Sequence, residues 1–195
     1  MVVIQPQPQK RPAASVASAA GGAALPIHVC DFSVAVDTRE QQPFTFSNII
    51  IAGKQWIIKR EVKTLQTADY SIVGFEDRIV VERKSPEDFM GSIAAGNARF
   101  RREHERMQAI IESAPGNFAA IVIEGNMAAM CDEVDNPNSG RRMTSETIIG
   151  ITASWPRRFG VHLFFAGDRR RAELLTFRIL LKWYQENVET RKEKR

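Results

Sequence analysis

The apolar residues of this chain gather in short continuous runs, which is the pattern of strands buried inside a sheet. Three such runs are Phe32–Val36, Phe118–Ile123 and Val161–Phe165. Elsewhere, apolar residues recur at the three- and four-residue spacing of helices that pack on one side. Helices are predicted from Ser85 to about Gly96, Asn97 to about Ser113, Thr144 to about Arg158, and Asp168 to about Glu189. This order of elements predicts an α/β architecture, a mixed sheet flanked by helices.

The stretch at 44–65 is predicted to add further β structure to this sheet. Its loose alternation of apolar and polar positions places Ile57, Val62 and Leu65 in the core. His104, in the second predicted helix, is expected to be a surface residue.

A β-hairpin is predicted between Tyr70–Val73 and Arg78–Val81, because four turn-forming residues separate the two apolar runs. If its loop is symmetric, Asp69 lies opposite Glu82, and opposed side chains share a sheet face with their Cβ atoms about 5 Å apart. Lys84 lies two residues beyond Glu82 and therefore points to the same face. The hairpin is thus predicted to gather two carboxylates and one ammonium in one place.

The charges of this hairpin need a partner, because like charges directly opposed destabilise a sheet. A divalent cation would offset Asp69 against Glu82, since Mg²⁺ and Mn²⁺ prefer carboxylate oxygens. The alternative is a solvated hairpin whose carboxylates have Lys84 as a partial counter-ion. The D…E-x-K pattern is too short to decide between the two on its own.

Charged residues also follow the predicted strand Phe32–Val36, namely Asp37, Arg39 and Glu40. Ligand sites in α/β sheets often lie outside the carboxyl ends of strands, although a polar strand end entering a turn looks the same. Asp88 lies three residues after the predicted helix cap at Ser85, so it either completes the cap or orients the site.

The second predicted helix places Arg99, Arg102 and Arg106 on one face. Glu103 and Glu105 interleave with them, which is the pattern of a salt-bridged helix surface. These two glutamates are therefore interpreted as partners of the arginines.

Composition narrows the class of protein. The chain has 195 residues, with 44% hydrophobic and 26% charged residues and a net charge of +4. These values fit one soluble domain and permit a polyanionic partner. No apolar stretch approaches the roughly 20 residues of a membrane span. Two cysteines without metal-ligand spacing, Cys30 and Cys131, are interpreted as reduced thiols of a cytoplasmic, non-secreted protein.

Three segments are predicted along the chain. Residues 1–30 are expected to form a flexible leader, because its first 26 residues are rich in Pro, Gln, Ala, Ser and Gly. Residues 31–189 are expected to form the folded domain, and 190–195 a charged tail.

Several motifs combine into a specific pattern. They are VDTRE at 36–40, ADY at 68–70, VERKSPED at 81–88, Arg99 followed by Phe100, and IVIEGN at 121–126. Together they resemble the XPF family of structure-specific endonucleases, within the PD-(D/E)XK nuclease superfamily. The resemblance covers about residues 33–185 and implies a restriction-endonuclease-like fold.

The resemblance also implies residue roles, carried over position by position. The family's signature acids fall on Asp37, Asp69 and Glu82, its basic residues on Arg39, Arg83 and Lys84, and its trailing acid on Asp88. All are present, which distinguishes this chain from the family's degenerate partner subunits. Ala68 stands where the family usually has Gly. The helix-hairpin-helix and helicase regions common in the family are missing from this sequence, so junction specificity and dimerisation carry over only weakly.

The implied reaction is hydrolysis of a DNA phosphodiester with Mg²⁺ or Mn²⁺ held by Asp69 and Glu82. Asp37 is expected to bind or position a second ion, and Lys84 to lie beside the attacking water. Arg39, Arg83 and Arg99 are expected to contact phosphate. Glu40 and Asp88 are expected to orient these basic groups.

The expected partner is branched DNA, such as flaps, forks or junctions, during repair, recombination or replication. A homodimer or a partner protein is also compatible with the resemblance, and a membrane is not. Two alternatives remain open. One is a non-catalytic DNA-binding scaffold subunit, and the other is a less structure-selective nuclease of the same superfamily.

Overall fold

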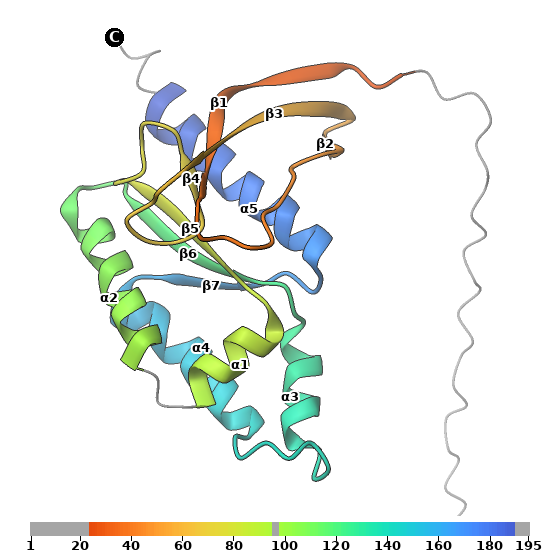
Figure 1. Cartoon of the computed structure of the whole chain (residues 1–195), viewed down its shortest axis with the longest axis vertical. Helices are drawn as coiled ribbons and strands as arrows, with labels where there is room; N and C mark the ends of the chain where they lie inside the picture. Colours follow the sequence, from red (N-terminus) through yellow and green to blue (C-terminus); the bar gives the residue numbers. More distant parts are fainter. Residues whose placement is uncertain (1–23, 95–97, 190–195) are drawn as a thin grey trace, which may run out of the picture.

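The computed structural model describes residues 24–94 and 98–189. In chain order the elements are β1 (Ile27–Asp37), β2 (Ile49–Ile51), β3 (Lys54–Lys63), β4 (Tyr70–Ile72), β5 (Ile79–Lys84), α1 (Pro86–Ala94), α2 (Ala98–Ser113), β6 (Phe118–Ile123), α3 (Met127–Asp135), α4 (Ser145–Phe159), β7 (His162–Phe165), α5 (Arg169–Tyr184) and a π-helical segment at Gln185–Glu189. The strands of this part of the chain form one mixed sheet in the order β2-β3-β1-β4-β5-β6-β7 (Figure 1). The predicted α/β sheet flanked by helices is confirmed.

The first strand begins earlier than the sequence pattern indicated. β1 starts at Ile27, four residues before the predicted start of the folded domain. Its first residues pair in parallel with β3, with Val29 beside Ile57. The early part of β1 was missed because Ile27 and Val29 are exposed and alternate with half-buried or buried positions. Residues 1–23 of the predicted leader and the predicted tail, 190–195, lie outside the described residues.

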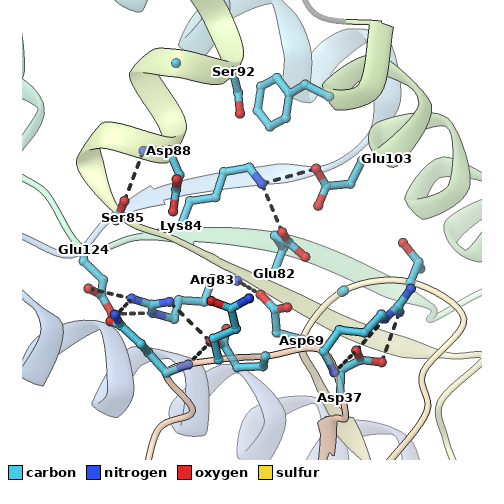
Figure 2. A pocket seen from close by; sticks show the side chains of 18 of the residues that line it. Asp37, Asp69, Glu82, Arg83, Lys84, Ser85, Asp88, Ser92, Glu103 and Glu124 are labelled. Atoms are coloured by element: carbon cyan, nitrogen blue, oxygen red, sulfur yellow. Dashed lines mark hydrogen bonds and ion pairs between the residues drawn. The ribbon is translucent and has the colours of Figure 1, made fainter.

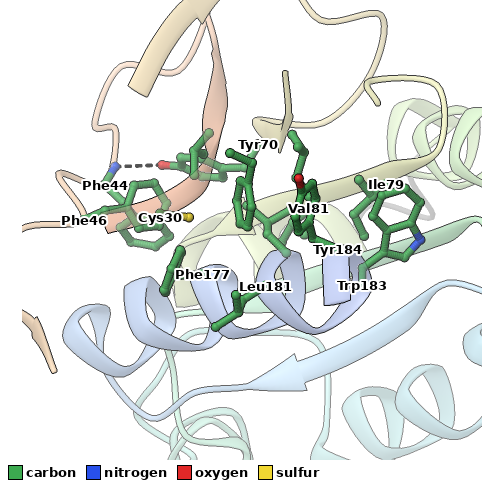
Figure 3. Packing of buried hydrophobic residues seen from close by; sticks show 14 of the residues in the cluster. Cys30, Phe44, Phe46, Tyr70, Ile79, Val81, Phe177, Leu181, Trp183 and Tyr184 are labelled. Atoms are coloured by element: carbon green, nitrogen blue, oxygen red, sulfur yellow. Dashed lines mark hydrogen bonds between the residues drawn. The ribbon is translucent and has the colours of Figure 1, made fainter. Parts of the chain in front are cut away.

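The two faces of the sheet are covered by different helices. α5 lies across one face, while α1, α2 and α4 lie on the other face of the β5–β7 half (Figure 1). Under α5, aromatic side chains from the 42–48 loop and β4 pack against those of the helix (Figure 3). Phe44 stacks on Tyr70 with ring centroids 5.1 Å apart, and its N–H donates to the Tyr70 hydroxyl at 2.8 Å. The loop after β1 is therefore fixed to the sheet.

The helices on the other face form a second core. Phe100 and Met107 of α2, which lie on one side of the helix, are buried there. His104 lies between them and is also fully buried, so the prediction of a surface residue is wrong. Its ring packs against Trp155 of α4 at 4.3 Å, and its Nδ1 hydrogen bonds with the Phe100 carbonyl oxygen. The interhelical contact that buries this residue is not encoded in the pattern of α2 alone.

The β3 strand departs from the predicted core pattern. Leu65, just after it, is buried as expected, but Ile57 and Val62 are 44% and 73% exposed. In β3 only Trp56 and Ile58 pack against the α5-side core, and the residues from 59 to 62 are exposed. The sequence could not show that α5 covers only part of this strand.

The predicted hairpin has the predicted register. Tyr70 of β4 pairs with Val81 of β5, so Asp69 and Glu82 are the next positions outward. β1 lies antiparallel to β4, and β6 lies parallel to β5. The ends of β1, β5 and β6 and the beginning of β4 therefore meet at one edge of the sheet. No helix among the described residues is long and apolar enough to span a membrane.

Candidate active site

A cleft of about 930 Å³ opens at the edge of the sheet where these strand ends meet. The predicted site residues that line it are Asp37, Arg39, Glu40, Asp69, Glu82, Arg83, Lys84 and Asp88. Only Arg99 is left over, because its side chain lies outside the described residues. The fold thus brings together every predicted site residue whose side chain the structure describes.

Asp69 lies immediately before β4 and lines the cleft. One of its carboxylate oxygens accepts a hydrogen bond of 2.8 Å from the backbone N–H of Arg83 on β5. Burial, reinforced by the nearby Glu40 carboxylate, raises the pKa of Asp69 to about 7. The residue before it, Ala68, is buried and has a left-handed φ of 65°. This conformation explains why glycine is the expected residue at that position.

Glu82 and Lys84 project into the cleft from the same face of β5 (Figure 2). The Lys84 Nζ lies 3.0 Å from Oε1 of Glu82 and 3.2 Å from Oε2 of Glu103, and these side chains are 10–13% exposed. Burial and the charge of Asp69 raise the pKa of Glu82 well above its ordinary value. Burial alone would lower the pKa of Lys84, but the carboxylates of Glu82 and Glu103 raise it. The lysine is therefore a cation at neutral pH.

Glu103 is the site residue that the sequence interpretation missed. It was assigned to a salt-bridged helix surface, but it points from α2 into the cleft and contacts Lys84 (Figure 2). Its spacing of three residues after Phe100 and four before Met107 could have revealed this, because that spacing puts it beside the buried stripe of α2. Glu105 does lie on the surface, paired with Arg101 at 2.9 Å.

Asp37 lies at the end of β1, and both of its carboxylate oxygens accept hydrogen bonds. One oxygen accepts from the backbone N–H and Nε of Arg39, the other from Nη2 of Arg39 and the N–H of Leu65, at 2.7–3.1 Å. Although burial opposes it, these bonds lower the pKa of Asp37. Among the described residues no three Asp, Glu, His or Cys side chains are placed to hold a metal ion together. Asp37 is thus a partner of Arg39 in this structure, and its role as a metal ligand stays a prediction.

Arg83 points to the opposite face of β5 from its two neighbours. Its guanidinium lies 2.6 Å from Glu124, 3.5 Å from Glu40 and 3.4 Å from the Gln42 side-chain oxygen, and its side chain is 10% exposed. Arg169 of α5 binds the same Glu124 at 2.7 Å. In this structure the donors of Arg83 serve this buried network, and its predicted phosphate contact stays a prediction. The predicted orienting role of Glu40 is consistent with its contact to Arg83.

The mouth of the cleft carries the remaining predicted residues. The Arg39 side chain is 65% exposed although it is anchored to Asp37. Ser85 caps α1 by accepting a hydrogen bond of 3.0 Å from the Asp88 N–H, as predicted. Arg106 of α2 is exposed and also lines the cleft. Two cationic side chains, Arg39 and Arg106, are thus open to solvent beside the acidic floor.

Comparison with known proteins agrees with this geometry. Residues 36–177, well over half of the chain, match the model of the ERCC4 domain family. The comparison with curated protein sequences gave no match. XPF from Aeropyrum pernix is a similar solved structure, with a TM-score of 0.53 and 24% identity over 83% of this chain and 69% of that one. A structure of the same protein in complex with DNA has a TM-score of 0.52 and 22% identity over 80% and 66% of the two chains.

The family match spans every strand end that lines the cleft, from the end of β1 to the start of α5. The structural match covers 83% of this chain. The chain therefore belongs to the ERCC4 domain family and has the fold of XPF nucleases.

Proposed function

We propose that this protein is a DNA endonuclease that hydrolyses phosphodiester bonds with a divalent metal ion. The observation that carries the proposal is the placement of Asp69, Glu82 and Lys84 together on the floor of one cleft. Membership of the ERCC4 domain family supports the same reaction. The competing reading as a non-catalytic scaffold is disfavoured, since a scaffold has no need for these buried charges, which oppose folding.

The donor set fits Mg²⁺ or Mn²⁺. Mg²⁺ is usually held by one or two carboxylates, with water and substrate phosphate oxygens completing the shell. Asp69 and Glu82 supply two carboxylates, and because burial raises the pKa of both, a bound cation would stabilise their charged forms. We therefore assign the metal to these two residues and leave Asp37, whose oxygens are already bonded, outside the set.

The chain's own residues then have distinct tasks. A bound divalent ion supplies Lewis-acid polarisation of the phosphate and a lowered pKa of water. Lys84, as a cation, stabilises the negative charge that develops beside it. Arg39, exposed and held by Asp37, binds a neighbouring phosphate oxygen of the DNA strand. Arg83 and Glu124 hold β5 and β6 together beneath the site.

The proposed substrate is DNA with a branch, such as a flap, fork or junction. The XPF structure in complex with DNA supports DNA as the ligand. Arg39 and Arg106, at the mouth of the cleft, are placed to contact its phosphates. The resemblance to structure-specific endonucleases supports the branch and its use in repair, recombination or replication. Assembly as a homodimer, or with a partner protein, is part of the same proposal.

End-labelled single-stranded, duplex, 3′-flap, fork and four-way-junction DNA would test the proposal, each with Mg²⁺, Mn²⁺ or EDTA. Wild type is compared with Glu82→Ala and with Asp132→Ala, a control for an exposed acid on α3. We expect metal-dependent cutting of branched DNA by wild type and the control, and none by Glu82→Ala. Cutting of every substrate would retain the nuclease and reject the branch specificity. Binding without cutting under all conditions would favour the scaffold.

A further inference from the structure

The ammonium group of Lys84 is held from two sides by carboxylates of different elements. Glu82, on the same strand, accepts at 3.0 Å, and Glu103, on α2, accepts at 3.2 Å. A lysine ammonium has three N–H donors arranged tetrahedrally. When two of them are fixed by acceptors, the direction of the third is fixed as well.

Glu103 is rigidly placed because the helix around it is anchored. Phe100, one turn earlier, is 2% exposed, and the Lys84 Nζ lies 5.2 Å from the centre of its ring. His104, the next residue, is fully buried against Trp155 of α4. The carboxylate thus extends into the cleft from a backbone with little freedom to move.

We propose that Glu103 is a positioning residue that holds the Lys84 ammonium so that its third N–H is directed toward the reacting phosphate. The inference rests on the proposed function, because it assigns Lys84 to that reaction. Glu82 cannot serve this purpose alone, since it must also provide an oxygen for the divalent ion together with Asp69. Glu103 also shares a side-chain hydrogen bond with Glu82, but it is not one of the two residues assigned to the divalent ion, so it can keep Lys84 in place throughout the reaction.

Three variants test the inference, namely Glu103→Ala, Glu103→Gln and the control Glu105→Ala. Glu105 lies on the same helix, but pairs with Arg101 on the surface. For Glu103→Ala we expect kcat to fall on the order of 10- to 100-fold, because a small misplacement of a reacting group has effects of this size. The KM for DNA and the half-saturating metal concentration should stay within about twofold, because Glu103 binds neither.

The Glu103→Gln variant tests whether Glu103 acts by accepting a hydrogen bond from Lys84. Its amide oxygen can still accept a hydrogen bond from Lys84. We therefore expect Glu103→Gln to recover most of the lost kcat, and Glu105→Ala to equal wild type. Thermal unfolding of all variants checks that each retains a cooperative fold.

A second readout does not depend on cleavage. The acylation rate of Lys84 by an amine-reactive reagent, followed by peptide mass spectrometry, should be low in wild type and Glu103→Gln and higher in Glu103→Ala. If wild type cuts no DNA under any metal, the proposed function fails, while this rate still tests the positioning of Lys84. Unchanged acylation or unchanged kcat in Glu103→Ala would overturn the inference. The inference would also be overturned if Lys84 of Glu103→Gln were acylated as slowly as in wild type while the kcat of this variant stayed as low as that of Glu103→Ala.

Discussion

Asp37 and Arg39 hold each other in a closed arrangement at the end of β1. The guanidinium donates from Nε and Nη2 to the two oxygens of the Asp37 carboxylate, at 2.7 and 3.1 Å. The same carboxylate accepts from the N–H of Leu65, which ties β1 to the segment after β3. Asp37 thus fixes Arg39, an exposed arginine that lines the cleft, although Asp37 is itself buried.

Asp37→Asn should therefore lower stability. The amide places an NH₂ group where an oxygen now accepts from other donors, and charge-assisted hydrogen bonds are lost. We expect a loss of about 2–3 kcal/mol in the free energy of unfolding, measured by urea denaturation at pH 7. Asp31→Asn, at an exposed position of the same strand, should change it by less than about 0.5 kcal/mol. Equal effects of the two substitutions would refute the structural role of Asp37.

The raised pKa of Asp69 predicts how the stability of the metal-free protein depends on pH. The pKa of Asp69 is about 7 in the folded protein against an ordinary value of 3.8, so between these values only the folded state keeps the proton. Stability falls with rising pH wherever the folded state binds more protons than the unfolded state. In EDTA we therefore expect the contribution of Asp69 to lower the Tm as pH rises from about 4 to about 7.

The control for this pH dependence is Asp69→Asn, which cannot ionise. Its Tm should fall less over the same pH range than that of wild type. Mg²⁺ or Mn²⁺ should raise the Tm of wild type more at pH 8 than at pH 6, because a proton competes with the metal for the carboxylate. A metal-induced shift that is the same in Asp69→Asn would place the ion elsewhere.

Ala68 sets the direction of the chain just before Asp69, with a φ of 65°. Replacement by Gly relieves about 1–2 kcal/mol of left-handed strain but loses the burial of one methyl group, about 0.8 kcal/mol. Since the two effects nearly offset, Ala68→Gly should change the free energy of unfolding by less than about 1 kcal/mol and keep metal-dependent cleavage.

Ala68→Val is the informative counterpart. A β-branched residue is a strong outlier at positive φ, and this position is 8% exposed, with little room for two more carbons. We expect a loss of about 2 kcal/mol or more, with a fall in kcat as Asp69 is displaced. A valine variant as stable and active as the glycine variant would show that the turn tolerates any residue.

The hairpin was predictable because its information is local. A symmetric four-residue loop fixes which residues oppose each other, and this placed Asp69 opposite Glu82 without knowledge of the rest of the sheet. The same holds for β6, a continuous apolar run that became a strand with the predicted bounds, Phe118–Ile123. Register and burial in such segments follow from the period of the side chains themselves.

The parts that were missed depend on contacts between distant segments. The spacing within α2 places Glu103 beside the buried stripe of the helix, but it does not show that Lys84 lies opposite. Arg83 looked free to bind phosphate, because its acceptor Glu124 is 41 residues away in sequence. The charged residues alone thus indicated where the candidate site lies, but only the packing of α2 and β6 shows which contacts each of these side chains makes.

Arg83 and Arg106 both line the cleft, but substitution of Arg83 should lower the stability of the protein much more than substitution of Arg106. Arg83 is buried against Glu124 and Glu40, so Arg83→Met removes the cation beside Glu40 and leaves Glu124 with Arg169 alone. We expect a loss of about 3 kcal/mol or more in the free energy of unfolding. Arg106 is exposed, so Arg106→Ala should change this free energy by less than about 0.5 kcal/mol.

For DNA binding we expect the opposite ranking, with a larger effect from Arg106→Ala than from Arg83→Met. A side chain that contacts one phosphate adds about 0.9 to the slope of log K against log salt concentration, because it releases a bound counterion. In EDTA, which prevents cleavage, Arg106→Ala should reduce that slope by about this amount. Arg83→Met, measured below its unfolding temperature, should keep the slope of wild type. A reduced slope in Arg83→Met would mean that Arg83 leaves Glu124 to contact DNA, and that the buried network opens when the substrate binds.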